Sequence, residues 1–121
     1  MSIDAVIDRY CEAWSDPDPD QRARLLDGVW AAGATYTDPT VHAGGAAALL
    51  DHIAAVQTRR PGARVVRTSA VELHHDVARF TWAVLQPDGT SIYDGIDIAV
   101  LDPAGRIARM IGFFGPLAPR A

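Results

Sequence analysis

Three polar side chains lie among apolar neighbours and are candidates for acid–base chemistry: Tyr10, Asp38 and Asp97. Asp38 stands in "ATYTDPT", after a stretch that alternates like a β-strand and before Pro39, which favours an extended backbone at the preceding residue. A carboxylate held in an apolar pocket has a raised pKa because burial disfavours its charge, and this makes it a better base. The alternative is that Asp38 forms a surface turn through hydrogen bonds to nearby backbone, and the local pattern alone favours this turn.

The other two candidates are defined by the faces that they share with their neighbours. In "IYDGIDIAV", Asp97 shares one strand face with Tyr93, Gly95 and Ala99. Gly95 and Ala99 are small and leave space beside the carboxyl group of Asp97. The same alternation fits an aspartate on a solvated face of a sheet equally well. Tyr10 lies on the apolar stripe of a predicted helix, a position that is also typical of a core tyrosine with a satisfied hydroxyl.

The histidines and the glycine-rich segment offer weaker signals. His74 and His75 are adjacent, so their rings would point to opposite faces of a strand, which suits no single metal. His42 and His52 have no cysteine or acidic partner at a recognised ligand spacing. The segment "AGGAAA" lacks the lysine and the preceding strand of a phosphate loop, and no serine or cysteine stands in a nucleophile-elbow pattern. We therefore expect neither a metal nor a cofactor.

Three helices are predicted in the first half of the chain. Apolar residues at three- and four-residue steps predict the first, from Ile3 to Trp14. For the second, Asp18 fits the N-cap, Pro19 fits the first helical position and Gln21 would complete a capping box. Its predicted buried face comprises Leu25, Leu26, Val29 and Trp30. The third is expected over about 46–58, after a pair of glycines and before "RRPG".

The second half changes to a period of two, which is typical of strands. The predicted strands are "ARVVRTSAVEL", "VARFTWAVL", "SIYDGIDIAVL" and "RIARMIGFF", with turns at "HHD", "LQPDGT" and "LDPAGR" between them. Three helices followed by an antiparallel meander predict an α+β domain in which the helices cover one face of a curved sheet.

Composition limits the possible classes of protein. The chain has 121 residues, so residues 1–121 suit a single domain with a sizeable core. A formal net charge of −4 and scattered arginines argue against nucleic acid as a partner. A single cysteine, Cys11, allows no intrachain disulfide. The first residues carry acids and no long apolar run, and no window is apolar enough to cross a membrane, so a cytoplasmic protein is expected.

Several segments together resemble one known superfamily. "DRYCEAW", "VWAAGATYTDP" and "GIDIAVLDPAGRIARMIGFFG" are similar to the ketosteroid isomerase and SnoaL-like polyketide cyclase branch of the nuclear transport factor 2-like superfamily. The resemblance runs from about Tyr10 to Gly115, in one order and with similar spacings. It implies a cone-shaped fold, with three helices on a strongly bent, mostly antiparallel sheet around a deep apolar pocket. It also implies a homodimer formed through the sheet.

The resemblance further implies roles for the three candidates. Asp38 falls at the catalytic base, Tyr10 at the tyrosine that donates to the substrate oxyanion, and Asp97 at a protonated aspartate that donates a second hydrogen bond. The residues that would line the pocket are Trp14, Trp30, Phe80, Trp82, Met110 and Phe114. The chain departs from the isomerases at Ile53, where those enzymes often have a further tyrosine.

These expectations favour an isomerase or cyclase that acts on a small apolar carbonyl compound, steroid-like or polyketide-like, by proton abstraction with stabilisation of an oxyanion. The main alternative is a non-catalytic module for small-ligand binding or dimerisation. Epoxide hydrolysis ranks lower because it needs an Asp–Arg–Asp arrangement around a water. Arg79 and Arg109 are the available arginines, and the pattern places Arg109 opposite Met110 and Phe114, away from the pocket.

Overall fold

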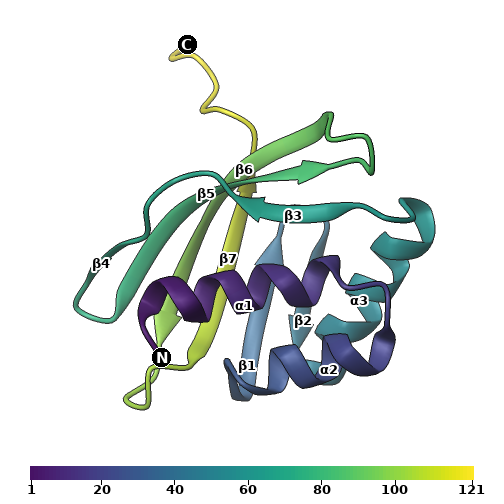
Figure 1. The fold of residues 1–121 in the computed structure, drawn as a ribbon. Coiled ribbons are helices and arrows are strands. Elements are labelled where there is room, and N and C mark those ends of the chain that lie inside the picture. Colours follow the sequence, from purple (N-terminus) through teal and green to yellow (C-terminus); the bar gives the residue numbers. More distant parts are fainter.

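The computed structural model describes residues 1–121, in which three helices pack on the concave face of a strongly curved seven-stranded sheet (Figure 1). The elements are α1 (Ile3–Ser15), α2 (Pro19–Asp27), β1 (Trp30–Asp38), β2 (Val41–Gly44), α3 (Ala46–Arg59), β3 (Arg64–Arg67), β4 (Glu72–His74), β5 (Val77–Leu85), β6 (Ser91–Leu101) and β7 (Ile107–Phe114). The strand order is β2-β1-β7-β6-β5-β3, and β4 also pairs with β5. All pairs are antiparallel except β1 with β7. This arrangement confirms the predicted α+β class and the mostly antiparallel sheet. The predicted order of three helices followed by a meander is wrong, because β1 and β2 precede α3.

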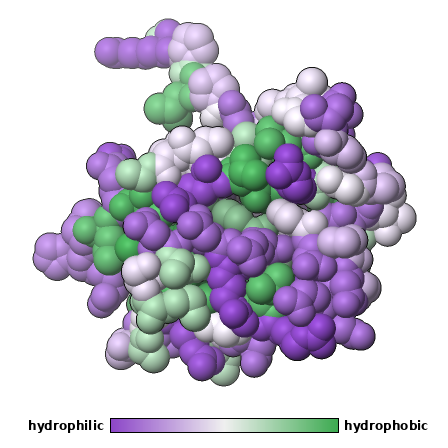
Figure 2. All heavy atoms as spheres, in the orientation of Figure 1, coloured by the Kyte–Doolittle hydropathy of each residue, from purple (hydrophilic) through white to green (hydrophobic).

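The first two helices begin at the residues that the sequence indicated. The side chain of Ser2 caps α1 by accepting a hydrogen bond from the Ala5 amide, and Asp18 caps α2 through the Asp20 amide. The predicted capping box does not form, because the Gln21 side chain accepts a hydrogen bond from Arg24 instead. On the face drawn in Figure 2, α1 and α2 turn mostly hydrophilic side chains outward, as expected of helices whose apolar stripe faces a sheet.

Two boundaries differ from the prediction. α2 ends at Asp27, so Val29 and Trp30 do not belong to its buried face, and Trp30 instead opens β1. The single strand expected from "ARVVRTSAVEL" is two strands, β3 and β4, which both pair with β5. The chain leaves β5 between them because the Ser69 hydroxyl, rather than a backbone carbonyl, accepts the hydrogen bond of the Thr81 amide.

The curvature of the sheet has a local cause on β1. The register of β1 against β7 shifts between Trp30 and Thr35, and Gly33 within this stretch has a φ of 73°. Irregularities of this kind bend a strand and increase its twist, and glycine adopts such a backbone at little cost. The bend wraps β1 and β2 toward α3, and α1 lies across the opposite part of the concave face (Figure 1).

A cluster of 23 buried apolar residues joins the helices to the concave face of the sheet. It includes Ile7 and Tyr10 of α1, Leu26 of α2, Ile53 of α3 and Met110 of β7. None of the three helices has the length and apolar character that a membrane span requires.

Candidate active site

The concave face of the sheet, α1 and α3 together enclose a cavity of about 540 Å³. A volume between about 300 and 1,000 Å³ is usual for sites that hold small organic molecules. The lining is mostly apolar and aromatic, with a few polar groups among the rings. Tyr10, Asp38 and Asp97, the three candidates from the sequence, all line this one cavity.

The registers of β5, β6 and β7 explain how deep each residue lies. Three rows of residues cross the concave face of these strands: Ala78–Ala99–Met110, Phe80–Asp97–Gly112 and Trp82–Gly95–Phe114. The first row is fully buried under the helices. The cavity begins at the middle row and opens along the third, so Asp97 lies at its deep end.

Asp38 is held by three hydrogen bonds at the end of β1. Its Oδ2 accepts from the Tyr36 hydroxyl at 2.6 Å, and its Oδ1 accepts from the Thr40 amide at 2.7 Å and the Thr40 hydroxyl at 2.6 Å. The bonds from Thr40 close the two-residue turn between β1 and β2, so the turn interpretation of Asp38 holds. The carboxylate nevertheless faces the cavity, with Oδ2 carrying only one protein donor. A single aspartate therefore forms the turn and is available to the cavity.

Asp97 occupies an apolar environment and is 5 % exposed. Its Oδ1 accepts a buried hydrogen bond of 2.8 Å from the Trp82 indole. Burial raises the pKa of Asp97 to about 7, the Trp82 bond opposes this effect, and the charge of Asp38 adds to it. Because Oδ1 is taken by the indole donor, the proton of the neutral acid resides on Oδ2. Near neutral pH a large fraction of Asp97 is thus a hydrogen-bond donor.

The Tyr10 side chain is 2 % exposed and stacks on Trp30, with ring centroids 5.9 Å apart. The buried indole N–H of Trp14, which also lines the cavity, has no hydrogen-bond partner. Burial raises the pKa of Tyr10 well above its usual value, and the charge of Asp97 raises it further. Tyr10 therefore stays protonated and can donate to a ligand.

Gly112 of β7 lies next to the side chains of both Asp97 and Asp38. A Cβ at this position would lie 2.8 Å from Asp97 Oδ1, 3.5 Å from Asp38 Cβ and 3.8 Å from the Tyr36 hydroxyl oxygen. Only a residue without a side chain leaves room for these groups to meet between β1 and β6. Burial, followed by the hydrogen bond to Asp38, raises the pKa of Tyr36, which therefore also remains a donor.

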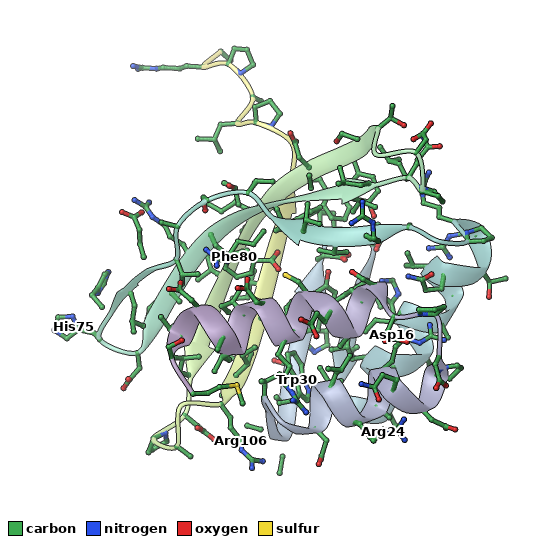
Figure 3. All side chains as sticks on the ribbon, in the orientation of Figure 1. Asp16, Arg24, Trp30, His75, Phe80 and Arg106 are labelled. Atoms are coloured by element: carbon green, nitrogen blue, oxygen red, sulfur yellow. The ribbon has the colours of Figure 1, made fainter.

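The predicted lining residues divide into two groups. Trp14, Trp82 and Phe114 line the cavity. Trp30, Phe80 and Met110 do not, and that part of the prediction is wrong: they are 4, 2 and 0 % exposed and fill the core. Phe80 lies between the sheet and α1 (Figure 3), Met110 belongs to the sealed row, and Trp30 is covered by the Tyr10 ring.

Several lining residues were not predicted from the sequence. α3 contributes His52, Val56 and Arg59 at helical spacing, a stripe that marks one helix face. The His52 ring packs against Trp14 at 5.7 Å and Tyr36 at 6.1 Å between ring centroids. Burial lowers the pKa of His52, so neutral imidazole is favoured. The other lining residues that were not predicted are Tyr36, Thr40, Gln57, Arg60, Ala63, Val65, Val84, Tyr93, Asp94 and Gly115.

No protein-family model and no curated protein matches the sequence of the chain. Among solved structures, it is similar to a candidate isomerase of the SnoaL-like family from Agrobacterium tumefaciens strain C58, with 30 % identity and a TM-score of 0.85. That match covers 92 % of this chain and 95 % of the other.

Two further structures share the fold at lower identity. A protein of unknown function from Exiguobacterium sp. 255-15, described as NTF2-like, is 20 % identical with a TM-score of 0.73, over 93 % of this chain and 99 % of the other. A candidate polyketide cyclase from Sinorhizobium meliloti is 19 % identical with a TM-score of 0.68, over 88 % and 92 %. At these identities the likeness concerns the fold alone.

Proposed function

The chain belongs to the SnoaL-like family of the nuclear transport factor 2-like superfamily, and from this premise we propose that it is an isomerase or cyclase acting on a small apolar carbonyl compound. The observation that carries the proposal is the convergence of Asp38, Asp97 and Tyr10 on one largely apolar cavity. Two of these groups are suited to donate hydrogen bonds and the third to accept a proton.

The proposed reaction begins when Asp38 Oδ2 takes a proton from the carbon next to the substrate carbonyl. The electron pair of the broken C–H bond moves toward the carbonyl oxygen, which becomes negatively charged. The Tyr10 hydroxyl and the neutral Asp97 carboxyl donate to this oxygen in a site with little water, where such bonds are strong. In an isomerisation, Asp38 then returns the proton to another carbon. In a cyclisation, the enolate carbon attacks a second carbonyl, and Asp38 gives the proton to the alkoxide oxygen that forms there.

Tyr36 and Thr40 support the base. Their three hydrogen bonds hold the Asp38 carboxylate in one orientation, so no substrate binding energy is needed to order it. The raised pKa of Asp97 distinguishes it from the second carboxyl group of the site, and such a difference identifies the hydrogen-bond donor in other proton-transfer enzymes.

Epoxide hydrolysis is not favoured by the arrangement of the arginines. Arg79 is exposed and pairs with Glu72, and Arg109 is exposed on the convex face of the sheet. Neither lines the cavity, so no arginine from the sheet lies between Asp38 and Asp97. The alternative that deserves a test is a binding module that uses the cavity without chemistry.

Binding of 2-naphthol, which resembles a bound enolate, separates these two functions. We expect Tyr10→Phe to weaken binding about tenfold, since a hydrogen bond to a charged oxygen contributes roughly 1.5–3 kcal/mol. The affinity of the native protein should also fall as the pH rises through about 7, because ionised Asp97 no longer donates. Asp97→Asn should remove that pH dependence. Calorimetric titration from about pH 5 to about pH 9, roughly two units either side of the Asp97 pKa of about 7, measures all three.

Tyr93→Phe is the matched control, because Tyr93 also lines the cavity but pairs with Val84, one row further from Asp97 than Trp82 and Gly95. It should bind 2-naphthol as the native protein does. If the affinity for 2-naphthol changes neither with Tyr10→Phe nor with pH, the cavity holds no oxyanion site, and a non-catalytic binding module is favoured.

A further inference from the structure

A second, smaller hollow adjoins the mouth of the cavity. It measures about 230 Å³ and shares three lining residues with the main cavity: Arg59, Arg60 and Ala63. The two arginines follow one another at the C-terminal end of α3. A positive charge is favourable at a helix C-terminus, which helps to keep this pair in place. A ligand that fills the main cavity and extends into this hollow would pass the two guanidinium groups.

Neither arginine is neutralised by a protein carboxylate. The ion pairs of the chain involve Arg67 with Asp4 and Asp8, and Arg79 with Glu72. Asp94 lines the same cavity but forms no ion pair with Arg59 or Arg60.

The Arg60 guanidinium instead lies over the Tyr93 ring, 5.7 Å from its centroid. Such a contact engages the face of the guanidinium plane and leaves its N–H edge free for a hydrogen-bond acceptor.

The charges in the cavity are separated by depth. Asp97 lies at the deep end and Asp38 converges with it beside Gly112, whereas the arginines lie at the mouth. A ligand with one anionic end would be repelled by the Asp38 carboxylate and attracted by the arginines. These charges would favour the orientation in which the uncharged carbonyl end of the ligand points inward.

From this arrangement we propose that the substrate carries a carboxylate at the end opposite its reacting carbonyl, and that Arg59 and Arg60 bind it. The inference rests on the proposed function, since it takes the deep end as the place of the carbonyl. Guanidinium groups match the planar carboxylate with two parallel hydrogen bonds, which favours this group over an uncharged ester or amide. The substrate class is then an apolar oxo acid long enough to span the cavity.

The test uses a series of 4-hydroxyphenyl alkanoic acids of increasing chain length, each with its methyl ester. The phenol takes the place of the enolate at the deep end, and the chain carries the carboxylate outward. At the length that spans the cavity we expect the acid to bind about tenfold more tightly than its ester, the effect of a charged hydrogen bond. In the double variant Arg59→Gln/Arg60→Gln this ratio should fall to about one, while the ester binds as before, which also reports an intact fold.

Arg106→Gln is the matched charge control. Arg106 is exposed in the β6–β7 turn, at the opposite end of the sheet from the C-terminus of α3 (Figures 1 and 3). It should leave the ratio of acid to ester binding unchanged. Two results would overturn the inference and leave the proposed function standing. One is that each acid binds as tightly as its ester at every chain length. The other is that the preference for the acid remains in the double variant. If neither acids nor esters bind and 2-naphthol fails as well, the donor site itself is absent and both proposals fall.

Discussion

Replacing Asp38 with asparagine is expected to slow proton transfer about 10²–10⁴-fold, the usual contribution of a positioned general base. Asparagine keeps the shape of the side chain, and its carbonyl oxygen can still accept both hydrogen bonds from Thr40. Its amide cannot accept a proton from carbon. The rate is measured without knowing the natural substrate, by following the loss of the α-proton signals of 2-tetralone in D₂O by ¹H NMR.

Asp51→Asn provides the comparison, because Asp51 is an exposed aspartate of α3 that does not line the cavity. It should exchange 2-tetralone protons at the native rate. If the native protein accelerates exchange and Asp38→Asn does so equally, another group is the base and the assignment of Asp38 is wrong.

The second large effect concerns the pH dependence of stability. The folded state raises the pKa of Asp97 to about 7, against about 3.9 in an unfolded chain, so the folded protein binds this proton more tightly. The stability due to this proton is fully present below about pH 4 and is lost as the pH rises through about 7. Three pKa units correspond to about 4 kcal/mol, which is an upper bound for the loss.

Asp97→Asn removes the ionisation and keeps an oxygen for the Trp82 indole. The free energy of unfolding of this variant, relative to the native protein, should therefore rise between about pH 4 and pH 8, by up to about 4 kcal/mol. Urea unfolding at several pH values measures this difference. Asp94→Asn, at an exposed neighbour on the same strand, is the matched comparison over the same pH range. A flat profile for Asp97→Asn would show that Asp97 has an ordinary pKa in the folded state.

How far the sequence predicts this fold depends on the element. β5 and β6 have the predicted bounds, since their period-two pattern ends at unmistakable turn residues on both sides. β2 was missed because it has only four residues and follows β1 after a two-residue turn that contains Pro39, a residue that normally interrupts a sheet. The break between β3 and β4 depends on one side-chain hydrogen bond from Thr81 to Ser69, which no local pattern announces.

The sequence predicts the candidate site only in part, because tertiary contacts decide which residues reach the cavity. Alternation placed Asp97 on one of two strand faces, but only the tertiary fold decides that this face is covered by helices. Met110 and Phe114 share a strand face, yet one is sealed in the core and the other lines the cavity, because depth follows from the register with β5 and β6. Arg60 and Tyr93 are distant in sequence, so their contact could not be expected from either segment alone.

A crystal structure of the protein with 2-naphthol is the most direct test of the central claim, that a base and two oxyanion donors face one ligand. We predict that the naphthol oxygen lies within hydrogen-bond distance of both the Tyr10 hydroxyl and the Asp97 carboxyl, with the Asp38 carboxylate facing the adjacent ring carbon. A naphthol oxygen that instead points to the mouth, toward Arg60 and Tyr93, with Asp38 out of reach of the ring, would contradict it.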